Sequence, residues 1–103
     1  MNTPGILHKE HTLEGKFGDH DCVILDGVPL TPTESQKVRN HSPDGFNWGY
    51  GGSGPAQLAL ALMLKLTGSY DSYQDFKWRF VAALPARDFK VVFSIQRGVI
   101  RTL

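Results

Sequence analysis

The chain has little cysteine and no long apolar run. Cys22 is the only cysteine among the 103 residues, so no disulfide can form within the chain, which fits a reducing cytosol. Cys22 lies in the apolar alternation CVIL, where a lone cysteine is expected to be a small buried hydrophobe. The longest apolar run, residues 58–64, is too short to span a bilayer, and the first residues lack the basic and apolar parts of a signal peptide. We therefore expect a cytoplasmic protein that makes no use of a membrane.

Net charge is nearly absent as well. The formal balance of +1 gives no global attraction toward nucleic acid or membranes. Residues 1–36 nevertheless carry two basic and six acidic side chains, a balance of −4, and residues 77–103 carry six basic and one acidic, a balance of +5. Such a split suits a homo-oligomer, or a partner that contacts one end, although the fold can equally interleave the two sets. A mixed solvated surface is the simpler interpretation.

Length and apolar content favour one compact domain. Residues 1–12 are polar and contain a Pro-Gly pair, so we expect a flexible N-terminal segment followed by a domain over 13–103. Asp26-Gly27 between two apolar runs is a strong hairpin signal. The polar stretch 31–39 is expected to be a connection. Short strands are expected at residues 13–17, 21–25, 28–30 and 89–93.

The second half of the chain predicts two helices. The first should begin near Pro55, be buried on nearly all sides and end at Gly68. The second should open at residues 71–74, which resemble a capping box, and run to Leu84. Its aromatic stripe of Tyr73, Phe76 and Phe80 is typical of a core face, and a short terminal helix capped by Ser94 should carry Ile95, Val99 and Ile100. The element order indicates an α+β fold, a small antiparallel sheet (the hairpin plus a C-terminal strand) covered by two helices.

The loop 39–55 is the most informative segment. Four glycines lie between residues 49 and 54, and glycine allows positive φ and close approach of backbone to other atoms. The helix that follows presents free N–H groups and the positive end of its dipole, so the loop predicts an anion site. It is neither a Walker A loop nor a dinucleotide fingerprint. The candidate ligand-binding residues are Arg39, Asn40, His41, Ser42, Asp44, Asn47, Tyr50, Gly51, Gly52, Ser53 and Gly54.

The alternative for the same loop is a structural one. Phe46 and Trp48 are then expected to be largely buried, where they anchor an otherwise flexible glycine-rich segment against the helix. The other polar and aromatic side chains would attach the loop to the core, and Asp44-Gly45 would form a tight turn after Pro43. Burial of Trp48 distinguishes a scaffold from a contact surface.

Residue types allow three further functions. A phosphoester hydrolase would use His41 as base, Asp44 or Asn40 as orienting group and Ser42 or Ser53 as nucleophile, but neighbours in sequence rarely form a triad, so no catalytic residue is assigned. No standard zinc spacing exists, so we expect no metal or cofactor. The residues that a metal site would need are His8, His11, Asp19, His20, Asp21 and Cys22. A nucleic-acid surface is weakly supported, because no recognition signature accompanies it. Its members would be Lys77, Trp78, Arg79, Arg87, Phe89, Lys90, Arg97 and Arg101.

The segment RNHSPDGF followed by WGYGGSGPAQLALA, within residues 39–61, resembles the signature of a family of small uncharacterised proteins. These occur in bacteria, plasmids and phages and form a domain of unknown function. The resemblance extends loosely over most of residues 13–101 and implies an accessory protein of a phage or mobile element, without an activity or a catalytic residue. Two hypotheses follow for the bacterial host cell. The first is a non-enzymatic protein that binds an anionic, nucleotide-like ligand or an acidic patch on a host protein. The second is an anti-CRISPR-like inhibitor of a host defence complex.

Overall fold

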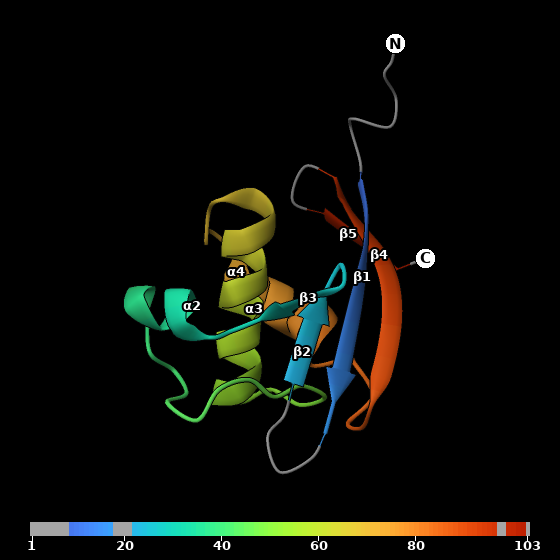
Figure 1. Ribbon diagram of the computed structural model, residues 1–103. Helices are drawn as coiled ribbons and strands as arrows, with labels where there is room; N and C mark the ends of the chain where they lie inside the picture. The colour runs from blue at the N-terminus through green and yellow to red at the C-terminus, as the bar shows by residue number, and fades with distance from the viewer. Residues whose placement is uncertain (1–8, 18–21, 97–98, 103) are drawn as a thin grey trace.

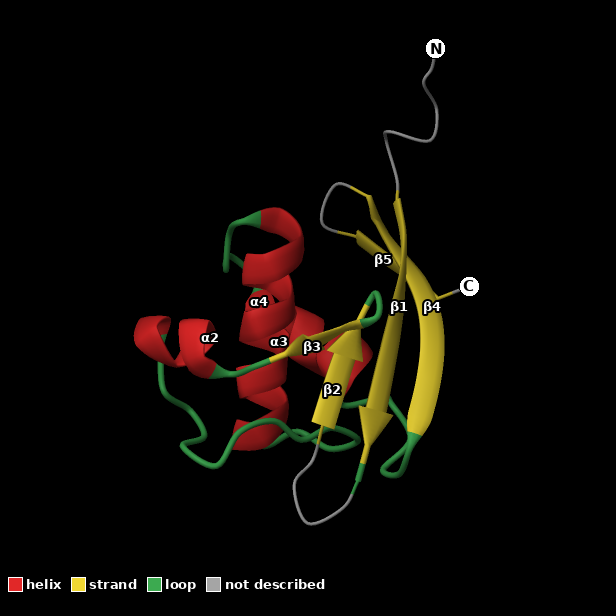
Figure 2. Ribbon diagram, viewed as in Figure 1, coloured by secondary structure: helices red, strands yellow, loops and turns green. Residues whose placement is uncertain are grey.

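The computed structural model describes residues 9–17, 22–96 and 99–102 (Figure 1). Helices lie on one side and a twisted sheet on the other, which confirms the expected α+β single domain (Figure 2). The elements in chain order are β1 (Lys9–Lys16), β2 (Cys22–Leu25), β3 (Val28–Leu30), α2 (Thr33–Val38), α3 (Ser53–Thr67), α4 (Tyr73–Phe76), η1 (Lys77–Val81), β4 (Phe89–Gln96) and β5 (Val99–Thr102).

The sheet has the strand order β3-β2-β1-β4-β5, and all four pairings are antiparallel. Asp26 and Gly27 both have positive φ, as a two-residue hairpin turn between β2 and β3 requires, so the expected hairpin is confirmed. The central pairing joins the acidic start of the chain to its basic end, with Glu14 of β1 opposite Lys90 of β4. Within the sheet the two charge sets are therefore interleaved.

Two expectations at the chain ends were wrong. Strand β1 begins at Lys9, so residues 9–12 belong to the sheet instead of the flexible segment expected over 1–12; residues 1–8 lie outside the described part. The C-terminal stretch forms strands β4 and β5 instead of a strand and a short helix. Ser94 lies inside β4 opposite Glu10, and Ile95 pairs with Ile100 across β4 and β5. Their spacing suits both a helix and a hairpin, and the neighbouring strand β1 selects the hairpin.

The helices also differ in detail from expectation. The connection 31–39 contains the short helix α2, which Pro32 precedes. Helix α3 begins at Ser53, and Gly68 ends it in the left-handed conformation, as expected. The expected helix over 71–84 is shorter: α4 continues into the π-turn η1 and ends at Val81. The capping box is not formed, because Ser72 has a positive φ and its side chain caps no N–H group.

The core lies between α3 and the helix-facing side of the sheet. Leu58 and Leu62 of α3 are fully buried, as is Leu13 of β1. Trp48 is 0% exposed and Phe46 is also buried, so the expected anchoring of the loop is confirmed. The expected burial of Cys22 is wrong, because the period-2 alternation of β2 buries its second and fourth residues and leaves Cys22 exposed. Within the described residues, no helix has the length and apolarity that crossing a membrane requires.

Candidate functional site

The first half of the loop, residues 39–42, is held by one buried side chain of α3. Gln57 is fully buried, and its Oε1 accepts hydrogen bonds from the backbone N–H groups of His41 (2.7 Å) and Ser42 (3.0 Å). Its Nε2 donates to Ser35 Oγ (2.8 Å) and to the Arg39 carbonyl oxygen (3.1 Å). The amide thus has four partners, and it connects α2, the loop and α3 at one point.

The second half of the loop is held by close backbone packing. The Gly49 N–H donates to the Val81 carbonyl oxygen (3.0 Å), and Gly49 has a φ of +84° with the Ala86 backbone beside it. A Cβ at Gly49 would lie 2.8 Å from Ala86 Cα, so only glycine fits. Gly54 packs in the same way on Asn47, whose Oδ1 accepts the Trp48 N–H at 2.8 Å. Much of the glycine content therefore serves to pack the loop onto its neighbours.

Trp48 fixes the middle of the loop to the sheet side. Its Nε1–H donates to the Arg87 carbonyl oxygen at 3.0 Å, which satisfies the only polar atom of the buried ring. The ring packs edge-on against Phe89, with centroids 5.3 Å apart, and against Phe17 at 4.8 Å. These contacts attach the segment that leads into α3 to the sheet side of the fold.

The start of α3 is left without a cap. Gly52 precedes the helix in an extended conformation, no side chain accepts a hydrogen bond from the first turn, and that turn contains no acidic residue. Within the described residues, the N–H groups of Ser53 and Gly54 have no hydrogen-bond partner. Pro55 has no N–H to donate. Ser53 is exposed and Gly54 is buried, so the Ser53 N–H group and the positive end of the helix dipole lie at the surface.

Lys77 and Trp78 lie beside this helix start. The Trp78 ring is 60% exposed and lies against Gly51, where an added Cβ would come within 2.2 Å of a ring carbon. Lys77 is only 8% exposed, and its Nζ lies 4.3 Å from the centroid of the Trp78 ring. No carboxylate of the described residues forms an ion pair with that ammonium; the nearby Asp75 pairs with Arg79 instead, at 2.8 Å. The ammonium of a largely buried lysine therefore lies against an exposed aromatic ring.

The pKa of His41 depends on the charges in the same region. Its Nε2 lies 2.7 Å from the Tyr73 hydroxyl, which links the loop to α4. The pKa of His41 is lowered, first by desolvation and then by the positive charges of Arg39 and Lys77. No acidic side chain contributes to this shift. The potential around the imidazole is therefore positive.

The lowered pKa of His41 predicts a pH-dependent stability. Because the folded-state pKa lies below the ordinary value of 6.5, the unfolded chain takes up the proton first as the pH falls. The free energy of unfolding should therefore be largest above pH 6.5 and decrease as the pH falls toward the folded-state pKa. Denaturant titrations between pH 7.5 and 5 would measure this slope. His41→Gln should flatten it, and an unchanged slope in that variant would contradict the assignment.

A family model described as "Family of unknown function (DUF6166)" matches residues 14–102. The chain belongs to this family. The match spans the sheet from β1 to β5 together with the loop and α3, and it confirms the resemblance to a family of unknown function. No curated protein and no solved structure matches the chain.

Within this DUF6166 domain the candidate ligand residues fall into three groups. Around the start of α3 lie Tyr50, Gly51, Gly52, Ser53 and Gly54, with Tyr50 49% exposed. The second group consists of residues that make hydrogen bonds within the fold: Arg39, His41, Ser42 and Asn47. The positive charge of Arg39 also lowers the pKa of His41. The third group, Asn40 and Asp44, is exposed. Within the described residues, the partner of the His41 ring is Tyr73, and Asp44 is not hydrogen-bonded to it.

Gln57 and Tyr73 were missed as site residues from the sequence, and Lys77 and Trp78 were assigned only to the nucleic-acid surface instead of to the loop. In the expected core stripe, Phe76, Phe80 and Leu84 are buried, and Tyr73 is partly buried against the core while its hydroxyl reaches the loop. The available signal for Lys77 was its position one residue after Phe76 and four before Val81, both apolar, which places a lysine on the apolar face of the expected helix.

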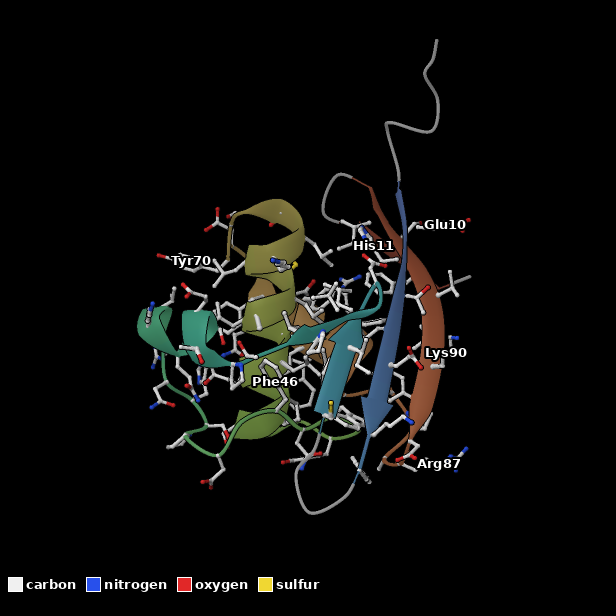
Figure 3. All side chains as sticks on the ribbon, in the orientation of Figure 1. Glu10, His11, Phe46, Tyr70, Arg87 and Lys90 are labelled. Carbon is white, nitrogen blue, oxygen red and sulfur yellow. The ribbon has the colours of Figure 1, made fainter. Side chains whose placement is uncertain are left out.

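The positions of the candidate residues do not support the metal or the nucleic-acid hypothesis. Within the described residues no three His, Cys, Asp or Glu side chains form a metal-binding group, and His11 is bonded to Asp26 at 2.7 Å. His8, Asp19, His20, Asp21 and Arg97 lie outside the described residues. Figure 3 shows Lys90 on the side of the sheet that faces away from the helices, whereas Lys77 is buried on the helix side.

Proposed function

We propose that this protein is a non-enzymatic binding protein for a nucleotide-like anion, held where the start of α3 meets Lys77 and Trp78. The observation that carries the proposal is Lys77, a residue that is only 8% exposed and whose ammonium pairs with no carboxylate of the described residues. Burial of a charge is unfavourable unless an opposite charge or hydrogen bonds compensate for it. A bound anion would supply that compensation.

The helix start supports the same ligand. The exposed Ser53 N–H group and the helix dipole favour negative charge, as do Arg39 and Lys77, which both act on His41. Phosphate suits such a site because it accepts several hydrogen bonds and carries charge at neutral pH. Binding should neutralise the local positive potential, so phosphate should raise the pKa of His41.

Exposed rings beside the cation indicate what the anion is attached to. Trp78 is 60% exposed and Tyr50 is 49% exposed, and both adjoin the segment that leads into α3. Flat rings stack on such side chains with little dependence on sequence or substituent. A phosphate attached to a nucleobase therefore fits the site better than inorganic phosphate alone.

The variant Lys77→Met tests whether Lys77 binds the ligand or only stabilises the fold. Methionine keeps the apolar stem and removes the buried charge, so the free energy of unfolding should rise by about 1 kcal/mol without ligand. Affinity for adenosine monophosphate should fall on the order of tenfold, because a charge-assisted hydrogen bond is lost. Denaturant titration and calorimetry would measure the two effects.

Lys90→Met is the matched control, since it removes the same charge from an exposed position of β4 on the other side of the sheet. It should leave the affinity unchanged and the stability within about 0.5 kcal/mol of the natural chain. Loss of stability in Lys77→Met with unchanged affinity would assign Lys77 a purely structural role and overturn the proposal.

A comparison of ligands tests the anion-binding part and the ring-stacking part of the proposed site separately. Adenosine monophosphate should bind more tightly than phosphate, and adenosine without phosphate should bind weakly. Trp78→Ala should lower affinity for the monophosphate by on the order of tenfold while leaving phosphate binding unchanged. Equal binding of adenosine and its monophosphate would contradict an anion site.

The second candidate is an acidic surface on a host protein, bound by the same rings and cations. Exposed Trp78 and Tyr50 are the observation that favours it, because aromatic residues often dominate protein interfaces. The protein would then act in the host cytoplasm as an inhibitor of a defence complex. A stoichiometric partner in a pull-down that Trp78→Ala abolishes, with no nucleotide binding, would favour this candidate. Hydrolysis is the third candidate, and the exposed position of Asp44 gives it no support.

A further inference from the structure

An open hollow lies away from the proposed anion site, bordered by the β2–β3 hairpin, α2 and the later part of α3. It has a volume of about 290 Å³. Its walls include the apolar side chains of Leu25, Leu30, Ala61 and Leu64, and Lys65 lies at its edge. No residue of the loop 39–55 lines it, and neither do Lys77 and Trp78. The hollow is therefore distinct from the site described above.

Short elements border the hollow. Strand β3 has three residues and α2 has six, and both contribute lining residues beside Ala61 of α3. Ala61 is small and buried, and it leaves space where a larger side chain would fill it. The polar Ser35 in the lining already has partners, since its Oγ donates to the Pro32 carbonyl oxygen and accepts from Gln57. An apolar group can thus enter without leaving the Ser35 hydroxyl unsatisfied.

The charges at the rim are not equivalent. Glu34 forms an ion pair with Lys37 at 3.2 Å, whereas Lys65 has no ion pair among the described residues. A cation beside an apolar hollow complements a molecule with an apolar body and one negative end. Engineered apolar cavities of about 150 Å³ take up benzene, so a hollow of 290 Å³ has room for a larger body.

We propose that this hollow binds a small carboxylate with an apolar body, such as a medium-chain alkyl carboxylate. The alkyl chain packs between Leu25, Leu30 and Leu64 over Ala61, and the carboxylate pairs with Lys65. Apolar contact provides most of the affinity, because an exposed ion pair contributes little. The proposal does not depend on the anion site.

Octanoate and octanol are the probes, because they share an alkyl chain and differ in charge. The natural protein should bind both, with octanoate more tightly, as measured by calorimetry or by NMR shifts of Leu30 and Leu64. Ala61→Leu fills the hollow and should weaken both ligands more than tenfold. Lys65→Gln should weaken octanoate about threefold and leave octanol unchanged, and Lys65→Arg should restore octanoate binding.

Val28→Asp provides a second test that does not disturb the core, because Val28 lines the hollow from an exposed position. The added negative charge should weaken octanoate more than octanol. Lys77→Met should leave octanoate binding unchanged, which separates this proposal from the anion site. Absence of octanoate binding to the natural protein, or equal binding to Ala61→Leu in its folded form, would overturn the proposal.

Discussion

Replacing Trp48 with alanine should lower the free energy of unfolding by about 3–5 kcal/mol. The ring is 0% exposed, packs against Phe89 and Phe17, and donates its single N–H to the Arg87 carbonyl oxygen. The substitution removes those contacts, opens a cavity and leaves that carbonyl oxygen without its partner. Because a domain of this size has a total stability of only about 5–15 kcal/mol, the loss would be a large share of it. Denaturant titration followed by circular dichroism would measure it.

Trp78→Ala is the matched control, because it removes the same side chain from a position that is 60% exposed. We expect a stability loss below about 1 kcal/mol, together with the weaker nucleotide binding predicted above. Trp48 is thus expected to contribute to the stability of the fold, and Trp78 to ligand binding. Similar stability losses in both variants would contradict that separation.

Replacing Gln57 with leucine should be the second most damaging change, at about 2–4 kcal/mol. Leucine has a similar size, so the loss comes from the hydrogen bonds and not from packing. Two backbone N–H groups, at His41 and Ser42, would lose their acceptor, and the Ser35 hydroxyl and Arg39 carbonyl oxygen would lose a donor. Residues 39–42 should then detach from α3, with faster amide hydrogen exchange at His41 and Ser42.

Gln36→Leu is the corresponding control. The Gln36 side chain makes one hydrogen bond to the same segment, from its Nε2 to the Ser42 carbonyl oxygen at 2.9 Å. Its loss should cost about 1 kcal/mol and leave most of the segment in place. If the two glutamine variants were equally stable, Gln57 would not be the point that holds the loop.

The residues of the proposed anion site could be predicted only in part. The glycines and the start of α3 were predicted because they are adjacent in the chain, and a helix N-terminus presents N–H groups in any context. Lys77 and Trp78 are more than twenty residues further along, and only the packing of η1 beside the loop brings Trp78 onto Gly51. The contact between His41 and Tyr73 also depends on that packing.

Local residue chemistry determined several parts of the fold from the sequence alone. Asp26-Gly27 has the positive φ angles of a hairpin turn, Gly68 ends α3 in the left-handed conformation, and the large apolar ring of Trp48 is buried. Each of these outcomes follows from the preference of a residue and its near neighbours. The tertiary structure decided the outcome where that preference was ambiguous. Residues 94–102 suit a helix or a hairpin, and pairing of β4 with β1 selects the hairpin because it satisfies the backbone hydrogen bonds of both strands.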